Sequence, residues 1–418
     1  MNFATLIKSG PTGRAALLLL PALVWYGAQN TESAIPSWES VTAQSTVVLG
    51  LITAVCGACA AWEGARLTSA RVDDWATARG PLRIAVEHLA PVALLGLAGL
   101  LAALATSSFT GAAPPVGYPD PAILGAAFLA VLAHVAVGYL VGRMLNRLLG
   151  AAVMLVAGYL WGFWPAALAS PAWLRHLNGQ GVTECCTLGQ EADPRSLAAT
   201  ALFGLALTAA ASAALWLDER RLRTAVAGGL AVVGVGVSVT LAVPLGFDGT
   251  RPRDRSALEC AGGAPQVCLW PEQQERRRLF RTAATEAGQR LEVVGVRLPA
   301  RVEYSMVDPR DAEIRTATAT SVLPGEPPAC AQGPGAQYPG WEAAGVLYAW
   351  LALTAGMSAQ ELSAQWPPQE VSLARKVRAL PAEAQAAWYE RNMRSVRDCD
   401  VRPELSPASF RHLQDDAA

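Results

Sequence analysis

The sequence predicts an all-α polytopic membrane protein of about seven transmembrane helices, N-terminus inside, with an extracytoplasmic C-terminal domain of mixed α+β structure. Three observations carry this prediction. Of the 418 residues, 52% are hydrophobic and only 16% are charged, whereas a soluble chain carries about a quarter charged residues. Long Ala/Leu/Val/Gly runs occupy the N-terminal part and stop before Phe247. Basic residues gather in alternate loops between these runs.

Seven runs are long enough to cross a bilayer, which takes about 20 apolar residues. They are residues 15–28, 44–62, 87–107, 122–142, 148–169, 196–217 and 225–246. The first run is the shortest and resembles the apolar part of a signal peptide. Pro21, Trp25 and Tyr26 stand where a cleavage site needs small residues, so a retained helix is predicted. Residues 1–246 then form the transmembrane domain.

Orientation follows from the basic residues, which favour cytoplasmic loops. With the N-terminus inside, the external loops hold only Arg175 and Arg195. The internal segments hold Lys8, Arg14, Arg66, Arg71, Arg79, Arg83, Arg143, Arg147, Arg220, Arg221 and Arg223. This asymmetry predicts a multi-pass protein of the bacterial plasma membrane, with residues 247–418 outside.

Six cysteines fall outside in this topology, where an oxidising compartment favours disulfides. Cys260 and Cys268 would close a short loop, and Cys330 and Cys399 are the natural long-range pair. The adjacent Cys185 and Cys186 would form a vicinal bridge or pair elsewhere. A zinc site is the alternative for Cys260 and Cys268, but their spacing without a nearby histidine matches no usual ligand pattern. No metal is therefore expected.

Cys56 and Cys59 form a C-x-x-C pair within the second predicted span. Such a pair can relay electrons in membrane thiol oxidoreductases. Small residues also let helices approach closely, and packing is the interpretation that this Ala/Gly-rich span favours.

His134 is the ionisable residue that lies well inside a span, in the fourth. Intramembrane ionisable groups are candidates for function. A neutral histidine bonded to a backbone carbonyl is the simpler alternative. The spans hold no chain of Asp, Glu or Arg, which argues against an ion-driven transporter.

The longest internal loop runs from Glu63 to Arg83. Leu67, Ala70, Val72 and Trp75 could line one face of a helix at the membrane surface. Such a helix can be an interfacial anchor, or a coupling helix that docks on a cytoplasmic partner; the sequence leaves both open.

The C-terminal part is predicted to comprise a linker, 247–257, a domain, 258–405, and a disordered tail, 406–418. The periodicities within the domain predict helices at 271–287, 341–357, 369–380 and 382–397, and one or two strands within 290–307. Asp308, Asp311 and Glu313 are interpreted as a solvated turn.

The sequence contains none of the usual catalytic motifs. The external histidines are His176 and His412, and no H-E-x-x-H, G-x-S-x-G or Walker sequence occurs. The chain is therefore not expected to be an enzyme or to hold a cofactor. A net charge of -1 gives no reason to expect a nucleic-acid partner.

The stretch "CAGGAPQVCLWPE", Cys260 to Glu272, opens the external domain after the Ala-rich spans and the basic loop. This layout resembles ABC-transporter permease-like membrane proteins of actinobacteria, and more weakly the ABC-2 type exporters. ABC-2 permeases have six spans and a coupling helix between the second and third; a seventh span and a large external domain depart from that pattern. The resemblance implies a separate cytoplasmic ATP-binding subunit, and a second permease-like subunit or a homodimer. The contact with the ATPase would then comprise Arg66, Arg71, Asp73, Asp74, Trp75 and Arg79.

Two other functions fit the same sequence. The chain could be a non-transporting membrane sensor or scaffold that uses the external domain for interactions. It could also be a membrane thiol–disulfide relay through Cys56 and Cys59, with Cys185 and Cys186 as an external pair.

Overall fold

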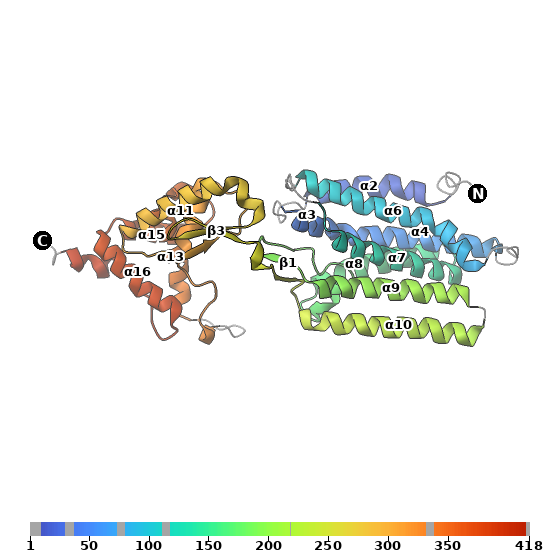
Figure 1. Ribbon diagram of the computed structural model, residues 1–418. Coiled ribbons are helices and arrows are strands. Elements are labelled where there is room, and N and C mark those ends of the chain that lie inside the picture. The colour runs from blue at the N-terminus through green and yellow to red at the C-terminus, as the bar shows by residue number, and fades with distance from the viewer. Residues whose placement is uncertain are drawn as a thin grey trace. The chain divides into compact units, whose positions relative to one another are not determined.

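The computed structural model of the chain describes residues 10–29, 37–72, 80–110, 118–217, 219–331 and 338–414 (Figure 1). The chain divides into two compact units, Met1–Arg253 and Asp254–Ala418. The first unit is a bundle of long helices. The second combines shorter helices with a small sheet.

Six helical segments among the described residues are long and apolar enough to cross a membrane, as expected of a multi-pass membrane protein. The second predicted span is longer than expected, because α3, a 3-10 turn and α4 form one helical segment, Trp38–Ser69. The helices of the bundle are α2 (Thr12–Gln29), α3 (Trp38–Ser45), η1 (Thr46–Val48), α4 (Leu49–Ser69), α6 (Pro81–Thr110), α7 (Pro121–Met144), α8 (Arg147–Ala167), α9 (Pro194–Trp216) and α10 (Arg220–Ala242).

The first predicted span forms helix α2, Thr12–Gln29, which is not among those six segments. Its Leu23 is fully buried and lies beside Gly99 of α6. Its Gly27 lies beside Thr106, further along α6. From the first contact to the second, the residue numbers increase in both helices, so α2 runs parallel to α6.

Short polar residues start three of the long helices. Asp120 caps α7 by accepting a hydrogen bond from the backbone N–H of Ala122 at 2.7 Å. Asp193 caps α9 in the same way, and Asn146 caps α8 through the N–H of Leu149 at 2.9 Å. Each cap satisfies an N–H group that the first helical turn leaves without a partner. Proline follows both aspartates and its fixed φ suits the first helical position.

Helix α4 lies at the centre of the bundle and packs on α7 and α8 through glycines. A Cβ atom at Gly142 of α7 would collide with the backbone oxygen of Ala61. A Cβ atom at Gly158 of α8 would meet the backbone of Ala54. Because these neighbours are backbone atoms, they cannot move aside as a flexible side chain would. The close approach of α4, α7 and α8 therefore requires glycine at these positions.

Replacing Gly142 by alanine is expected to destabilise the bundle by about 1–3 kcal/mol, because the added methyl group forces α7 away from α4. Gly125→Ala is the matched control on the same helix, since a Cβ there meets nothing within 4 Å. The control should leave the stability of the bundle unchanged or raise it by up to about 1 kcal/mol, because alanine favours the helix more than glycine does. Thermal unfolding of the full chain in detergent measures both. Equal effects of the two variants would contradict the close contact between α4 and α7.

The bundle has two ends, named here the Arg66 end and the Cys185 end. The Arg66 end is where α4, α7 and α9 finish and α6, α8 and α10 begin. At the Cys185 end, the segment between α8 and α9 contains the short helix η2 (Ala172–His176) and strand β1 (Gln190–Ala192). After α10 and η3 (Val243–Leu245), strand β2 (Thr250–Pro252) pairs antiparallel with β1.

Helix α10 packs mainly on α9, where Gly234 lies against Ala206. In the most apolar 18-residue stretch of this helical segment, only 11% of the residues are buried. Val232 and Val233 are 74% and 66% exposed. Exposing such an apolar surface to water costs free energy, whereas contact with the lipid chains of a bilayer is favourable.

The second unit begins with a three-stranded sheet in the order β3-β4-β5. Strand β4 (Gln266–Leu269) pairs antiparallel with β3 (Glu259–Ala261) and parallel with β5 (Arg301–Glu303). Val267, Leu269 and Val302 turn one face of this sheet onto Phe280.

Helix α13 is the centre of the second unit, with Leu347, Trp350 and Leu351 fully buried. The helix has 16 residues, and the ring of its Trp350 meets the ring of Trp388 edge-on, with 5.8 Å between the ring centroids. Its apolar surface is thus covered by protein, in agreement with the prediction of a buried helix. The helices of this unit are η4 (Arg255–Ala257), η5 (Pro271–Arg276), α11 (Arg277–Glu292), α12 (Asp311–Thr320), η6 (Ala329–Ala331), α13 (Gly340–Ala355), α14 (Ala359–Ser363), α15 (Pro368–Arg378), α16 (Ala382–Arg397) and η7 (Pro407–Gln414).

Three features of the second unit differ from the prediction. The segment expected as strands begins inside α11, and only Arg301–Glu303 is a strand, because Leu291 and Val294 pack into the helical core. The expected solvated turn at Asp311 and Glu313 instead starts α12. The expected disordered tail contains η7, whose Phe410 is buried against the same core.

Candidate functional site

The last turns of α4 carry a buried ion pair. Glu63 is only 3% exposed, and its Oε2 accepts a hydrogen bond from Nε of Arg66 at 2.8 Å. Nη2 of Arg66 lies 3.2 Å from Nδ1 of His88 on α6, and this Nδ1 is 3.9 Å from Oε2 of Glu63. Because a guanidinium can only donate, Nδ1 of His88 accepts and the imidazole proton is on Nε2. These three residues, the Glu63 cluster, tie the end of α4 to the start of α6.

Arg66 was predicted to contact an ATPase, and the structure places it in this cluster with 25% of its side chain exposed. Arg71 lies beyond the end of α4 with a left-handed backbone, φ 51°, and an exposed side chain. The other residues of the predicted contact, Asp73, Asp74, Trp75 and Arg79, lie outside the described residues. The i,i+3 spacing of Glu63 and Arg66 was a signal for the ion pair that the sequence offered.

The surface helix predicted to start at Glu63 differs from what the structure has. Residues Glu63–Ser69 continue α4, and Leu67 is buried in the core of the bundle. Val72 also packs against this core. Most of the described part of the predicted loop therefore belongs to the bundle.

Most arginines predicted to be internal occupy the Arg66 end of the bundle. Arg83 is exposed and pairs with Glu87 at 3.2 Å. The other basic residues at the helix termini there are Arg14, Arg66, Arg71, Arg143, Arg147, Arg220, Arg221 and Arg223. At the Cys185 end, Arg175 is buried and donates to the backbone oxygen of Ala166, and Arg195 pairs with Asp193 at 2.7 Å.

Cys56 and Cys59 are buried on α4 and are not bonded to each other. Sγ of Cys56 lies 3.7 Å from the backbone oxygen of Val92 and beside Gly96 of α6. The Cys56 thiol therefore fills space between α4 and α6. Buried apolar surroundings make a thiol inert, which favours packing over electron relay.

His134 lies in the middle of α7, and its Nδ1 is 2.8 Å from the backbone oxygen of Ala130. The backbone oxygen can only accept, so Nδ1 carries a proton. This is the simpler of the two arrangements that the sequence allowed. His134 also lines a cavity with residues of α8 and α9.

At the Cys185 end, Cys185 and Cys186 lie at disulfide distance from each other and are buried beside Ala43 and Val182. Glu39 of α3 lies next to them, and its Oε1 accepts from the backbone N–H of Ala192 at 2.5 Å. Among the described residues, these three ligand groups lie within 4.8 Å of one another and could hold a metal ion if the sulfurs were reduced. The disulfide occupies the same sulfurs, so the two states exclude each other.

His176 fastens the segment between α8 and α9, a role that sequence alone did not indicate. Its side chain is fully buried; Nδ1 lies 2.8 Å from Oγ of Ser196 and Nε2 lies 3.1 Å from the backbone oxygen of Gly246. Because Gly246 can only accept, Nε2 carries the proton and Nδ1 accepts from the Ser196 hydroxyl. Burial lowers the pKa of His176 below its ordinary value, because the charged ring would lose its water.

The stability that His176 contributes should therefore depend on pH. Its pKa is lower in the folded than in the unfolded chain, so the unfolded chain takes up the proton first as pH falls. The contribution is complete above about pH 6.5, the ordinary pKa of histidine, and is lost as pH falls below it. Thermal unfolding measured between about pH 7.5 and 5.5 should show this loss, and His176→Gln should reduce the slope. An unchanged slope in the variant would assign the pH dependence to other groups.

In the second unit, the two cysteine pairs expected from the sequence lie at disulfide distance. Cys260 and Cys268 face each other across the β3–β4 ladder, with 3.9 Å between their Cα atoms. Cys330 in η6 and Cys399 after α16 have Cα atoms 6.6 Å apart. The second pair joins parts of the unit that are 69 residues apart in sequence.

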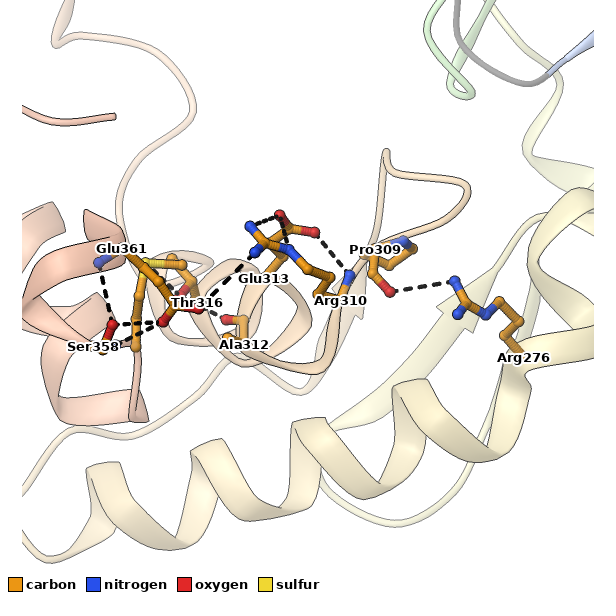
Figure 2. A network of polar contacts seen from close by, with 9 residues as sticks. Arg276, Pro309, Arg310, Ala312, Glu313, Thr316, Ser358 and Glu361 are labelled. Atoms are coloured by element: carbon orange, nitrogen blue, oxygen red, sulfur yellow. Dashed lines mark hydrogen bonds and ion pairs between the residues drawn. The ribbon is translucent and has the colours of Figure 1, made fainter. Parts of the chain in front are cut away.

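A polar network on the second unit accounts for its acidic cluster (Figure 2). Glu313 accepts from the backbone N–H of Arg310 at 2.8 Å and from its guanidinium at 2.7 Å, which caps α12. Glu361 accepts from the Ser358 hydroxyl at 2.7 Å at the start of α14, and this bond keeps the pKa of Glu361 below its ordinary value. Arg276 bonds to Asp308 and to the backbone oxygen of Pro309. These carboxylates thus stabilise helix starts and loops, and the network contains no poised acid–base pair.

Residues 267–399 match a family model described as Domain of unknown function (DUF7224). The match lies within the second unit, from β4 to the cysteine after α16, and includes Cys268, Cys330 and Cys399. The similarity covers about a third of the chain. No curated protein matches the chain. No solved structure matches it either.

Proposed function

We propose that the chain is the membrane subunit of an ABC-type exporter of the bacterial plasma membrane, and that a separate ATPase docks on the segment between α4 and α6. The observation that carries this proposal is the Glu63 cluster. It joins the two helices that flank the docking segment, and α4 is also the helix on which α7 and α8 pack. A displacement of residues 70–80 would therefore reach the centre of the bundle through a stiff helix. The lack of a Walker motif agrees with an ATPase on another chain.

The proposed topology has seven spans with the N-terminus inside. Nine basic residues at the Arg66 end favour that end as cytoplasmic. Helix α2 counts as a span because its 18 residues extend about 27 Å at 1.5 Å per residue and lie parallel to α6. Because α10 begins at the Arg66 end, the second unit then lies outside. The number of spans decides the side of the N-terminus: seven put it inside, whereas six would put it outside with the second unit.

Docking is tested by purifying the tagged chain from its native host in mild detergent and identifying its partners by mass spectrometry. A stoichiometric ATPase subunit is expected. Arg71→Glu with Arg79→Glu should abolish its recovery. Arg220→Glu with Arg221→Glu, which reverses as much charge at the same end but at α10, should leave it intact. Arg66 is not a suitable site for this test, because its replacement breaks the Glu63 cluster. Failure to recover an ATPase under several detergents would sink the transporter proposal.

Topology is tested separately with reporter fusions. Alkaline phosphatase fused after Gln414 should be active and green fluorescent protein there should be dark, since each reports a different compartment. The reverse result would place the Arg66 end outside and would contradict the proposed orientation.

The second candidate function is a membrane sensor or scaffold. The observation that favours it is that the family match lies within the second unit, which suggests that this unit is a module with its own role. A purification that recovers periplasmic or cell-surface partners without an ATPase would favour it.

A further inference from the structure

A cavity of about 220 Å³ lies within the first unit, between α7, α8 and α9. Its floor consists of small residues, Ala133, Ala157 and Gly158, and this is why space remains there. Gly158 must stay small because it touches the backbone of α4 on its other side. The larger lining residues are His134, Val137, Met154, Trp161, Phe203 and Leu207.

Helix geometry places the cavity near the middle of the bundle along its length. His134, Met154 and Leu207 are each 13 residues from the terminus of their helix at the Cys185 end. At 1.5 Å per residue they lie about 20 Å from that end. Trp161 and Phe203 are nearer to it, and their rings stack at 5.6 Å between centroids with a 21° interplanar angle. This aromatic pair borders the cavity on the Cys185 side.

His134 gives the cavity its hydrogen-bonding character. Because Nδ1 donates to Ala130, Nε2 of the neutral ring is an acceptor. The other lining side chains are apolar, apart from the indole N–H of Trp161 and the weakly accepting sulfur of Met154. A phospholipid does not suit this acceptor, since its polar groups lie at the membrane interface, whereas His134 is 10 residues, about 15 Å, from the nearer end of α7. The acceptor suits a molecule that is dissolved in the hydrocarbon and carries its own donor.

We propose that this cavity binds a membrane-soluble molecule with an aliphatic body and one hydroxyl group, whose O–H donates to Nε2 of His134. The body packs on the small-residue floor and against the stacked rings of Trp161 and Phe203. A volume of 220 Å³ holds roughly seven groups the size of a water molecule, so the bound part is a short chain. The site goes beyond the transporter proposal and does not depend on an ATPase.

The test uses the full chain in lipid nanodiscs and the photoreactive alcohol 3-azioctanol, with labelled residues mapped by mass spectrometry. Saturable labelling is expected on α7, α8 and α9 at the lining residues. Unlabelled 1-octanol should compete about fivefold better than its methyl ether, the factor that one hydrogen bond of about 1 kcal/mol gives. His134→Leu should remove this preference, and Ala157→Phe should abolish labelling by filling the cavity. Gly125→Phe, on the open side of α7, is the control and should change neither.

Each variant is first checked for the wild-type elution volume and unfolding temperature, so that a folding defect is not mistaken for lost binding. Equal competition by alcohol and ether would overturn the proposed hydrogen bond. A preference for the alcohol over the ether that persists in His134→Leu would overturn it as well. Labelling that Ala157→Phe leaves intact would overturn the site.

The hydroxyl compound can come from the bilayer or from the set of exported compounds, and extraction of the purified protein distinguishes them. An alcohol that co-purifies with wild type but not with Ala157→Phe identifies a bilayer component. Intact labelling without such an alcohol identifies a compound that must be supplied.

Discussion

Glu63→Leu is expected to destabilise the helix bundle by about 2–4 kcal/mol, because it leaves the Arg66 guanidinium in a mostly buried place without its anion. Glu63 is 3% exposed, and among the described residues the acceptor that remains near Arg66 is the neutral His88 ring at 3.2 Å. An unpaired charge in a membrane-spanning helix is costlier than a missing contact of the same size. The measurement is thermal unfolding of the full chain in detergent, followed by tryptophan fluorescence and size-exclusion chromatography.

Two further variants show whether the pair is the cause. Glu63→Leu combined with Arg66→Met removes both charges at similar volume and should recover most of the loss. Glu87→Leu removes the anion from an exposed pair with Arg83, where the side chains are 42% and 69% exposed. Exposed pairs contribute about 0–1 kcal/mol, so this control should be mild. If Glu63→Leu were no worse than Glu87→Leu, the cluster could not fix α4 to α6, and the proposed route from the docking segment into the bundle would lose its physical basis.

The positions of the long helices along the chain could be predicted because a bilayer leaves the backbone few alternatives. Every backbone group in hydrocarbon must find a partner inside its own segment, so each apolar run becomes a helix. The predicted runs 122–142 and 196–217 correspond closely to α7 and α9, whose starts are marked by Asp-Pro pairs. The end of α4 was less predictable. Glu63 and Arg66 look like the exit from a membrane, yet they neutralise each other and the helix continues to Ser69.

The elements of the second unit were harder to predict from the sequence, for a different reason. Strands β3, β4 and β5 have three or four residues each, and their pairing joins Gln266 to Arg301 across the whole of α11. Short strands of this kind depend on partners that local sequence does not reveal. Helix α12 was missed because its N-cap is Arg310, a residue without the short side chain that marks most helix starts.

The candidate sites depend most on distant contacts. His176 bonds to Ser196 and Gly246, 20 and 70 residues away. The cavity beside His134 is formed by three helices whose lining residues span 133 to 207. The chemistry of single residues could be read from sequence, whereas the identity of their neighbours required the fold.

Removing the Cys330–Cys399 bond is expected to destabilise the second unit more than removing the Cys260–Cys268 bond. The sequence separations are 69 and 8 residues. A longer closed loop restricts the unfolded chain more, and the chain-entropy relation gives about 4 kcal/mol for the first bond and about 2.5 kcal/mol for the second. Urea unfolding of the full chain carrying Cys330→Ser with Cys399→Ser, or Cys260→Ser with Cys268→Ser, measures the order. The buried Trp350 and Trp388 report unfolding of this core by fluorescence.

The same four cysteines also test the topology, because disulfides persist in oxidising compartments and not in the cytosol. Alkylation of the unfolded protein without a reductant, followed by mass spectrometry, should find all four thiols blocked in protein taken from its native membrane, and Cys56 and Cys59 modified. If Cys330 and Cys399 were alkylated as well, the second unit would lie in a reducing compartment, and the Arg66 end could not be cytoplasmic. The stability order and the thiol count are independent. A reversed order with blocked thiols would contradict only the loop-length argument, whereas free thiols would remove the extracytoplasmic domain on which both candidate functions depend.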